Sequence, residues 1–195
     1  MNLPNKLTMG RIIMVIPFIL CLELFDKNIF MDLLAALFFG AAALTDFLDG
    51  YIARKKNLIT DFGKLMDPLS DKILVLAALI IFVEKGYIWS WMVIIIIARE
   101  FLVTGIRIIA ASKGEVIPAD KTGKYKTATQ MIAIPMIIFT KGYTIHGFLA
   151  EYGINSPEVL NFRVSLSNLL MIIPLVLTIW SGIEYIEKSK KHFYS

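Results

Sequence analysis

Four aspartates stand at helical spacing within strongly apolar sequence: Asp46 and Asp49 in one segment, and Asp67 and Asp71 in the next. At about 100° per residue, each pair falls on one stripe of a helix. An ionised carboxylate in the middle of a membrane helix costs about 2.5–3.5 kcal/mol, so acids placed there mark functional sites. The four acids therefore predict a site where carboxylates are paired or bound to metal.

The chemistry predicted for this site is displacement at phosphorus. If the two acidic faces meet, they carry a charge of about −4, which about two divalent cations neutralise, and oxygen ligands suit Mg²⁺ or Mn²⁺. Two ions about 3.5–4 Å apart can stabilise both the attacking and the leaving oxygen of such a displacement. Gly50 and Gly63 would let a bulky diphosphate approach the backbone, and Arg54 offers a donor fork for phosphate. The alternative is that the acids form a solvated face at two adjoining helix ends.

The composition predicts an all-α integral membrane protein. The chain has 195 residues, of which 57% are hydrophobic and 18% charged, and its apolar runs reach spanning length. We expect one membrane-embedded catalytic domain over residues 1–195 with six transmembrane helices. Their approximate ranges are 7–25, 29–48 continuing to 53, 65–83, 87–111, 127–140 and 166–186. The fifth is short and is expected to begin nearer Lys121, and Pro17, Pro135 and Pro174 are expected to kink helices without ending them.

The basic residues predict the orientation. The net charge of +4 comes from residues beside apolar segments, which favours membrane topology and anionic lipid over nucleic acid as the explanation. One side of the six-span arrangement carries Lys6, Arg11, Arg54, Lys55, Lys56, Lys64, Lys113, Lys121, Lys124, Lys126, Lys188, Lys190 and Lys191. That side is expected to be cytoplasmic. Both termini and the acidic site then face the cytoplasm, with a short basic turn over residues 54–64 and helix-start signals at Asp61, Asp67 and Pro68.

The acidic segment resembles the signature of the CDP-alcohol phosphotransferase family. That signature, Asp-x2-Asp-Gly-x2-Ala-Arg-x8-Gly-x3-Asp-x3-Asp, is matched at every specified position from Asp46 to Asp71. The resemblance implies a six-helix membrane bundle, generally dimeric, whose active site opens to the cytosolic side. It also implies that a substrate hydroxyl attacks the lipid-bearing phosphorus of a CDP-lipid, so that CMP leaves.

The resemblance implies roles for individual residues. Asp46, Asp49, Asp67 and Asp71 would bind two divalent ions, and Asp71 would also act as general base. Contacts with the CDP-lipid, CDP-diacylglycerol, would come from Asn5, Thr8, Asp49, Gly50, Arg54, Thr60 and Gly63. Asn5 and Thr8 are included because residues 4–8 are similar to a Pro-Asn-x-x-Thr element of the family that helps hold the nucleotide. Helix capping by Asn5 or Thr8 is an alternative explanation.

A second set of residues indicates the acceptor alcohol. Arg99, Arg107, Lys121, Lys124 and Lys126 could bind a phosphate dianion, with arginine as a planar fork and lysine as a point charge. The alternatives are topology anchoring for Lys121 and an internal ion pair with Glu100 for the arginines. Residues 98–101 and 123–127 look like the branch of the family whose acceptor is sn-glycerol 3-phosphate, which would give phosphatidylglycerophosphate in a bacterial plasma membrane.

Other functions stay open on these residues. Within the family, the acceptor could be serine, inositol phosphate or phosphatidylglycerol. Outside it, a divalent-cation transporter could use the same acids, although they cluster on one side of the membrane and lack acidic partners deeper in the later helices.

Overall fold

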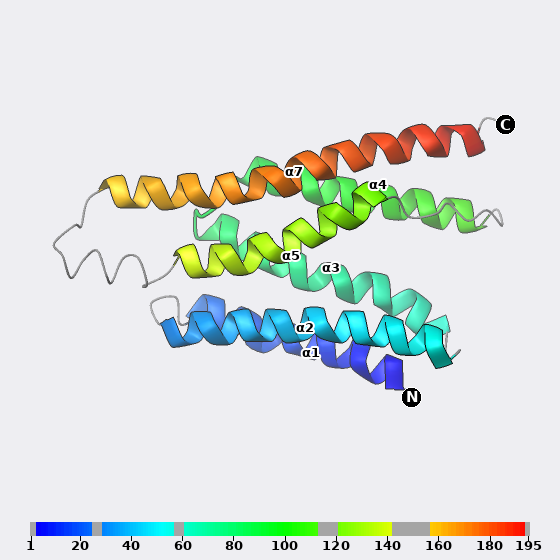
Figure 1. The fold of residues 1–195 in the computed structure, drawn as a ribbon, viewed down its shortest axis with the longest axis horizontal. Coiled ribbons are helices and arrows are strands. Elements are labelled where there is room, and N and C mark those ends of the chain that lie inside the picture. Colours follow the sequence, from blue (N-terminus) through cyan, green and yellow to red (C-terminus); the bar gives the residue numbers. More distant parts are fainter. Residues whose placement is uncertain (1–2, 25–28, 57–60, 113–120, 142–156, 194–195) are drawn as a thin grey trace.

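The computed structural model describes residues 3–24, 29–56, 61–112, 121–141 and 157–193, and this part of the chain is helical except for the connection at 85–89 and contains no strand. Its six helices are α1 (Leu3–Leu24), α2 (Ile29–Lys56), α3 (Asp61–Glu84), α4 (Ser90–Ser112), α5 (Lys121–Lys141) and α7 (Pro157–Phe193). They run lengthwise through the molecule in alternating directions (Figure 1). Helices α1, α3 and α5 therefore begin at the end where α2, α4 and α7 finish. We call this the motif end, because the acidic signature lies there.

The connection between α3 and α4 shows how the sequence reverses the chain. Gly86 has a positive φ of 70°, a backbone conformation that glycine adopts without a Cβ clash. The N–H of Tyr87 donates to the carbonyl of Phe82 at 2.8 Å, and that of Gly86 to Val83 at 3.0 Å. This is a Schellman cap, and the Phe82 and Tyr87 rings pack with centroids 6.3 Å apart. The cap ends α3 at the opposite end of the bundle from the motif.

One continuous core joins α1, α2 and α3. Buried residues recur at helical spacing on each: Val15, Phe18 and Leu22; Ala35, Phe39 and Ala42; Leu74, Ala78 and Phe82. The rings of Phe18 and Phe39 lie 5.8 Å apart between centroids. Spacings of three and four residues give each helix an inward stripe. Because α1 packs closely on both α2 and α3, the two acidic segments are held by a shared partner.

Helix α7 organises the other half of the bundle, where it packs against α5 and α4. At the end opposite the motif, the side-chain carbonyl of Asn168 accepts a hydrogen bond of 3.0 Å from the backbone N–H of Trp89. The core continues here through Met92, Ile96, Ile134, Ile137 and Met171, all nearly inaccessible. The interior of this half is thus apolar in its middle, with buried polar residues such as Asn168 at the end opposite the motif.

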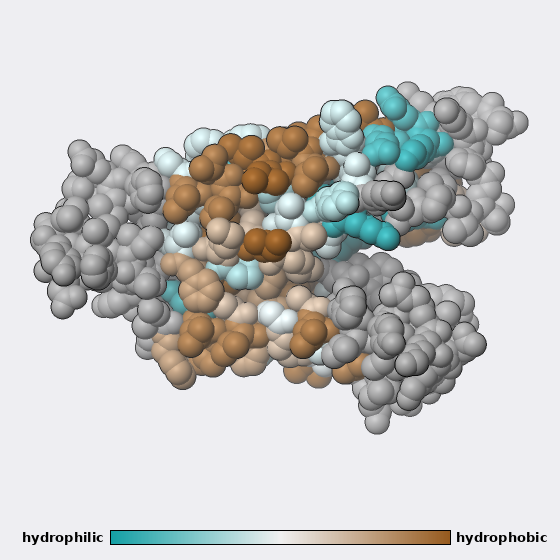
Figure 2. Space-filling model, viewed as in Figure 1, coloured by the Kyte–Doolittle hydropathy of each residue, from teal (hydrophilic) through white to brown (hydrophobic). Residues whose placement is uncertain are grey.

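The outward surface is also apolar. Large hydrophobic side chains are exposed on every described helix, with Ile13 at 61%, Ile94 at 64% and Trp180 at 65%. Figure 2 shows apolar residues across the middle of one face and hydrophilic residues toward the motif end. An apolar surface of this extent indicates contact with lipid or another apolar partner.

The structure tests the predicted spans in part. Within the described residues, one helical segment, Val164–Ser189, is long and apolar enough to cross a membrane, and Phe30–Thr45 is a shorter apolar segment. The 26 residues of the first extend about 39 Å at 1.5 Å per residue, against a hydrocarbon core of about 30 Å. An all-α fold is confirmed, whereas six crossings stay a prediction.

Several predicted boundaries need correction. Helix α5 does begin at Lys121, and Pro17, Pro135 and Pro174 all lie inside helices, as expected. Helix α3 begins at Asp61, so Asp67 and Pro68 are internal and are not start signals. The predicted turn over 54–64 is shorter, because α2 continues to Lys56. The last helix begins at Pro157 and extends to Phe193, well beyond the apolar run, because polar residues add helical turns at both ends.

Candidate functional site

The acidic signature lies on two helices that meet the same end of the bundle. Asp46 and Asp49 belong to the last three turns of α2, and Asp67 and Asp71 to the second and third turns of α3. Figure 1 shows the end of α2 and the start of α3 together at the motif end. The side chains of these acids, and of Gly50, Arg54 and Gly63, lie outside the described residues, as does all of Thr60. The backbone arrangement is compatible with two facing acidic stripes.

The N-terminal element lies at the same end, inside α1. Because α1 begins at Leu3, Asn5 and Thr8 are within the helix, and the alternative that they cap it is wrong. Thr8 is buried, at 1% exposure. The side chain of Asn5 lies outside the described residues. Of this element, Thr8 therefore belongs to the packed interior of the motif end.

A buried arginine one turn further along α1 reaches the helix that carries Asp67 and Asp71. Arg11 is 1% exposed, and its Nη1 donates a hydrogen bond of 3.0 Å to the Oγ of Ser70, which is completely buried. Ser70 directly precedes Asp71 in α3. Sequence reasoning treated Arg11 only as a topology residue, although an arginine inside an apolar helix is itself a signal of a specific role. The contact fixes α1 against α3 beside the signature.

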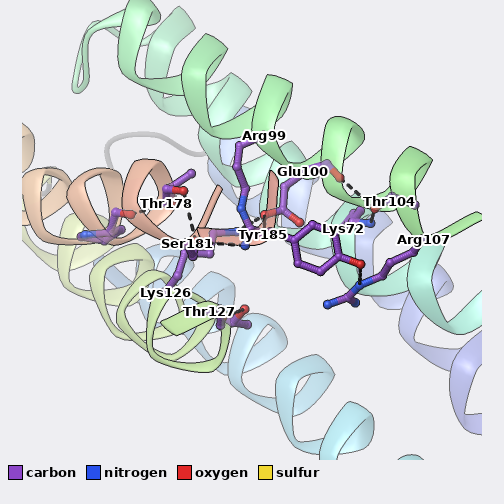
Figure 3. A network of polar contacts seen from close by, with 12 residues as sticks. Lys72, Arg99, Glu100, Thr104, Arg107, Lys126, Thr127, Thr178, Ser181 and Tyr185 are labelled. Atoms are coloured by element: carbon purple, nitrogen blue, oxygen red, sulfur yellow. Dashed lines mark hydrogen bonds and ion pairs between the residues drawn. The ribbon is translucent and has the colours of Figure 1, made fainter. Parts of the chain in front are cut away.

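A cluster of charged residues surrounds Glu100 near the motif end (Figure 3). The Glu100 carboxylate pairs with Arg99 at 3.2 Å and with Lys126 of α5. The side chains of Arg99, Glu100 and Lys126 are 14%, 17% and 4% exposed, so most of this charge is removed from solvent. Lys72 of α3 is close enough for its charge to act on Glu100 and Lys126. We call these four residues the Glu100 cluster: three cations and one carboxylate, with a net charge of +2.

Lys72 connects the Glu100 cluster to the acidic signature. Its Nζ donates a hydrogen bond to the Oγ1 of Thr104 on α4, and that hydroxyl donates to the backbone carbonyl of Glu100 at 2.7 Å. Lys72 immediately follows Asp71 in the sequence. Helix α3 therefore contributes to both groups from consecutive residues. Sequence reasoning missed Lys72, because a lysine beside the signature looks like one more positive topology residue.

Helix α7 positions Arg99. The Oγ of Ser181 accepts a hydrogen bond of 2.9 Å from Arg99 Nη2 and donates to the carbonyl of Thr178 at 3.1 Å, which fixes the orientation of the hydroxyl. Next to it, a Cβ added to Gly182 would lie 3.1 Å from Arg99 Cγ, so this glycine makes room for the arginine stem. Neither residue could be found from sequence, since isolated small residues in an apolar helix usually serve packing alone.

The remaining predicted acceptor residues are distributed around the Glu100 cluster. Arg107, two turns further along α4, is exposed; its Nε donates to the Tyr185 hydroxyl at 3.4 Å, and its Cζ lies 5.3 Å from the ring centroid. Lys124 is exposed, and the side chain of Lys121 lies outside the described residues. The predicted alternative of an internal pair with Glu100 thus describes Arg99, whereas the described contacts of Arg107 are with Tyr185 on α7.

We expect Glu100→Gln to lower the stability of the protein. The change leaves Arg99 and Lys126 mostly buried without their shared carboxylate, and losing one member of a buried ion pair costs about 3–5 kcal/mol. Thermal unfolding in detergent measures the effect. Glu184→Gln is the matched control, because the Glu184–Lys188 pair of 2.9 Å is more exposed than the Glu100 pairs and exposed pairs contribute little. Glutamine also keeps an oxygen that can accept the hydrogen bond of Thr122. Equal, small changes in both variants would contradict a stabilising role for Glu100.

Comparisons with known proteins agree with this architecture. The sequence profile described as CDP-alcohol phosphatidyltransferase matches residues 1–180. The chain belongs to this family of membrane enzymes.

Curated relatives match over nearly their whole length. The chain is 41% identical to the CDP-diacylglycerol–glycerol-3-phosphate 3-phosphatidyltransferase of Bacillus subtilis (strain 168), covering 96% of this chain and 95% of the relative. It is 37% identical to the protein of that name from Rickettsia felis, covering 98% and 97% respectively. For the one from Haemophilus influenzae, identity is 34%, with 97% and 94% covered.

Proposed function

We propose that this protein transfers the phosphatidyl group of CDP-diacylglycerol to sn-glycerol 3-phosphate, giving phosphatidylglycerophosphate and CMP. The names of its relatives support both substrates. The structural observation that carries the choice of acceptor is the Glu100 cluster, whose net charge of +2 matches a phosphate dianion. Charge matching in a site shielded from water strengthens binding, because the local dielectric is lower than that of bulk water.

The donor half of the site is assigned to the acidic signature. Four carboxylates form a hard-oxygen donor set that fits Mg²⁺ or Mn²⁺, and divalent ions are general in this family. Two ions held by Asp46, Asp49, Asp67 and Asp71 would supply charge neutralisation at the diphosphate. The other donor contacts come from Asn5, Thr8, Gly50, Arg54, Thr60 and Gly63.

The reaction then needs few protein groups. Asp71 accepts the proton of the acceptor hydroxyl, whose oxygen forms a bond to the lipid-bearing phosphorus. The bond between that phosphorus and the bridging oxygen of the diphosphate breaks, and CMP leaves with the electron pair. Arg54 stabilises the negative charge that grows on the diphosphate oxygens. Arg99 and Lys126 hold the acceptor phosphate, assisted by Arg107, Lys121 and Lys124 as it approaches.

The proposed setting is a bacterial plasma membrane with six crossings, cytoplasmic termini and a cytoplasmic active site. The alternating helices support an even number of crossings, and the lysines of the motif end support its cytoplasmic orientation. We also propose a homodimer in lipid, for which the exposed apolar helix faces provide room.

The reaction is tested with purified protein in detergent, CDP-diacylglycerol, labelled sn-glycerol 3-phosphate and Mg²⁺ or Mn²⁺. We expect labelled lipid and CMP in equal amounts, both abolished by chelation of the metal. Parallel reactions with serine, inositol phosphate and phosphatidylglycerol test the other acceptors. Labelling with one of those alone would overturn the assigned acceptor but keep the family. Metal uptake into vesicles without CMP release would instead favour the transporter.

A further inference from the structure

Among the described residues, the side-chain amide nitrogen of Gln130 on α5 is buried without a hydrogen-bond partner. The residue is 2% exposed, and among the described residues its Nε2 has no acceptor. Buried amide groups in folded proteins are nearly always hydrogen-bonded, because losing water without gaining a partner is unfavourable. An amide kept in this state needs an explanation, and a ligand that supplies the acceptor is one.

The spacing along α5 shows which way Gln130 faces. Gly123, Lys126 and Gln130 lie within about 60° of one another around the helix at 100° per residue. A Cβ added to Gly123 would be 3.6 Å from Arg99 Nη2, and Lys126 pairs with Glu100. This stripe therefore faces the Glu100 cluster. It continues inward through Ile134 and Ile137, both fully buried, so Gln130 is the polar residue where the cluster meets the apolar core.

A second unpaired donor lies in the Glu100 cluster. Within the described part of the chain, Arg99 Nε is buried and has no hydrogen-bond partner. The other guanidinium nitrogens are occupied: Nη1 donates to Glu100 and Nη2 to Ser181. Both unpaired groups are N–H donors, so this part of the site offers donors in excess of acceptors. A phosphate group, with three terminal oxygens, has the complementary chemistry.

We propose that Gln130 is a specificity-determining residue that donates its amide N–H to a phosphate oxygen of sn-glycerol 3-phosphate. This inference rests on the proposed function and adds a residue to its acceptor site. Gln130 forms the inner limit of the site and recognises the phosphate without adding charge, because the Glu100 cluster already matches a dianion. A carboxylate in the same place would repel the acceptor.

The test uses Gln130→Met, which keeps the side-chain length but removes the amide, and Gln130→Glu, which keeps the shape but adds a charge. Ala128→Met and Ala128→Glu are the matched controls, because Ala128 is exposed on the same helix. Steady-state kinetics in detergent give kcat and the KM of each substrate. Thermal unfolding with sn-glycerol 3-phosphate, in the absence of CDP-diacylglycerol, reports acceptor binding separately from turnover.

For Gln130→Met we expect the KM for sn-glycerol 3-phosphate to rise about 10-fold, the cost of losing one hydrogen bond to a charged group. The KM for CDP-diacylglycerol should stay within about twofold. The Tm of the ligand-free variant should be equal to or above that of the wild type, because an unpaired amide has been replaced by an apolar group. The increase in Tm that sn-glycerol 3-phosphate produces should be smaller for Gln130→Met than for the wild type.

Gln130→Glu should raise the KM for sn-glycerol 3-phosphate about 100-fold, because its carboxylate repels the phosphate. The Ala128 variants should change neither KM.

The outcomes separate this inference from the proposed function. If the wild type uses sn-glycerol 3-phosphate and Gln130→Met keeps its KM and its ligand-induced Tm shift, Gln130 has no role in recognition and the proposed function stands. A lower Tm with equal increases in both KM values would make Gln130 a packing residue and overturn the inference. If the wild type neither binds nor uses sn-glycerol 3-phosphate, the proposed function fails, and the role of Gln130 fails with it. If Gln130→Glu fails to fold, the kinetics and Tm shift of Gln130→Met decide whether Gln130 recognises the acceptor.

Discussion

Replacing Asp71 with Asn is expected to reduce CMP release by at least about 10³-fold. The substitution removes the proton acceptor for the attacking hydroxyl, a contribution of about 10²–10⁴-fold, and also one of the four carboxylates assigned to the metal ions. Asparagine keeps the size of the side chain, so the protein should fold normally. The measurement is metal-dependent CMP release at saturating concentrations of both substrates.

Asp61→Asn is the matched control for this change. It makes the same replacement in the same helix, at its first residue, at a position whose residue type the signature leaves unspecified. Its activity should stay within about twofold of the wild type, as expected for a position without a specific role. Substantial turnover by Asp71→Asn at saturating metal would show that another group accepts the proton, and the role assigned to Asp71 would have to be withdrawn.

The second large effect is expected at Arg99. We expect Arg99→Ala to raise the KM for sn-glycerol 3-phosphate about 100-fold, because truncating one member of a buried, hydrogen-bonded charge pair costs about 2–5 kcal/mol. Arg99→Lys should be nearly as impaired. A lysine ammonium lacks the planar fork that reaches Glu100 and Ser181 at once. The KM for CDP-diacylglycerol should change little, since its contacts are assigned to α1, α2 and the start of α3.

Lys85→Ala serves as the control for Arg99. It removes a cation at the opposite end of the bundle, where Lys85 Nζ lies 3.5 Å from the carbonyl of Glu23. The KM for sn-glycerol 3-phosphate should be the same in Lys85→Ala as in the wild type. An Arg99→Ala enzyme with unchanged affinity for sn-glycerol 3-phosphate would mean that the Glu100 cluster is purely structural. In that case the acceptor phosphate must bind elsewhere.

The sequence predicted which segments are helices better than it predicted where each helix begins and ends. Apolar runs and the signature located all six helices of the described part, and Lys121 was correctly expected to begin α5. Hydropathy follows the apolar centre of a helix, so it missed the polar extensions of α7 toward Pro157 and Phe193. The residue types also suggested helix starts at Asp67 and Pro68, which lie inside α3, since acidic residues and proline favour a first helical turn wherever they occur.

The candidate site was only partly readable for a related reason. Arg99 and Lys126 were found because charged residues beside apolar segments need an explanation. The bond from Arg99 to Ser181, the approach of Lys72 and the unpaired amide nitrogen of Gln130 depend on which helices pack together. One sequence does not contain that information. Glu100 was considered only as an alternative partner for the arginines. The structure makes it the carboxylate shared by Arg99 and Lys126.

Consecutive residues of α3 contribute to both halves of the proposed reaction. Asp71 belongs to the donor side and Lys72 to the acceptor side, and their Cα atoms are about 3.8 Å apart in any trans peptide. The separation between the proposed proton acceptor and Lys72 is therefore set within one helix, whereas its separation from Arg99 and Lys126 also depends on how α4 and α5 pack against α3. An acceptor must place its hydroxyl and its phosphate at that separation. We therefore expect the packing of α3 against α4 and α5 to select the length of the alcohol, as well as its charge.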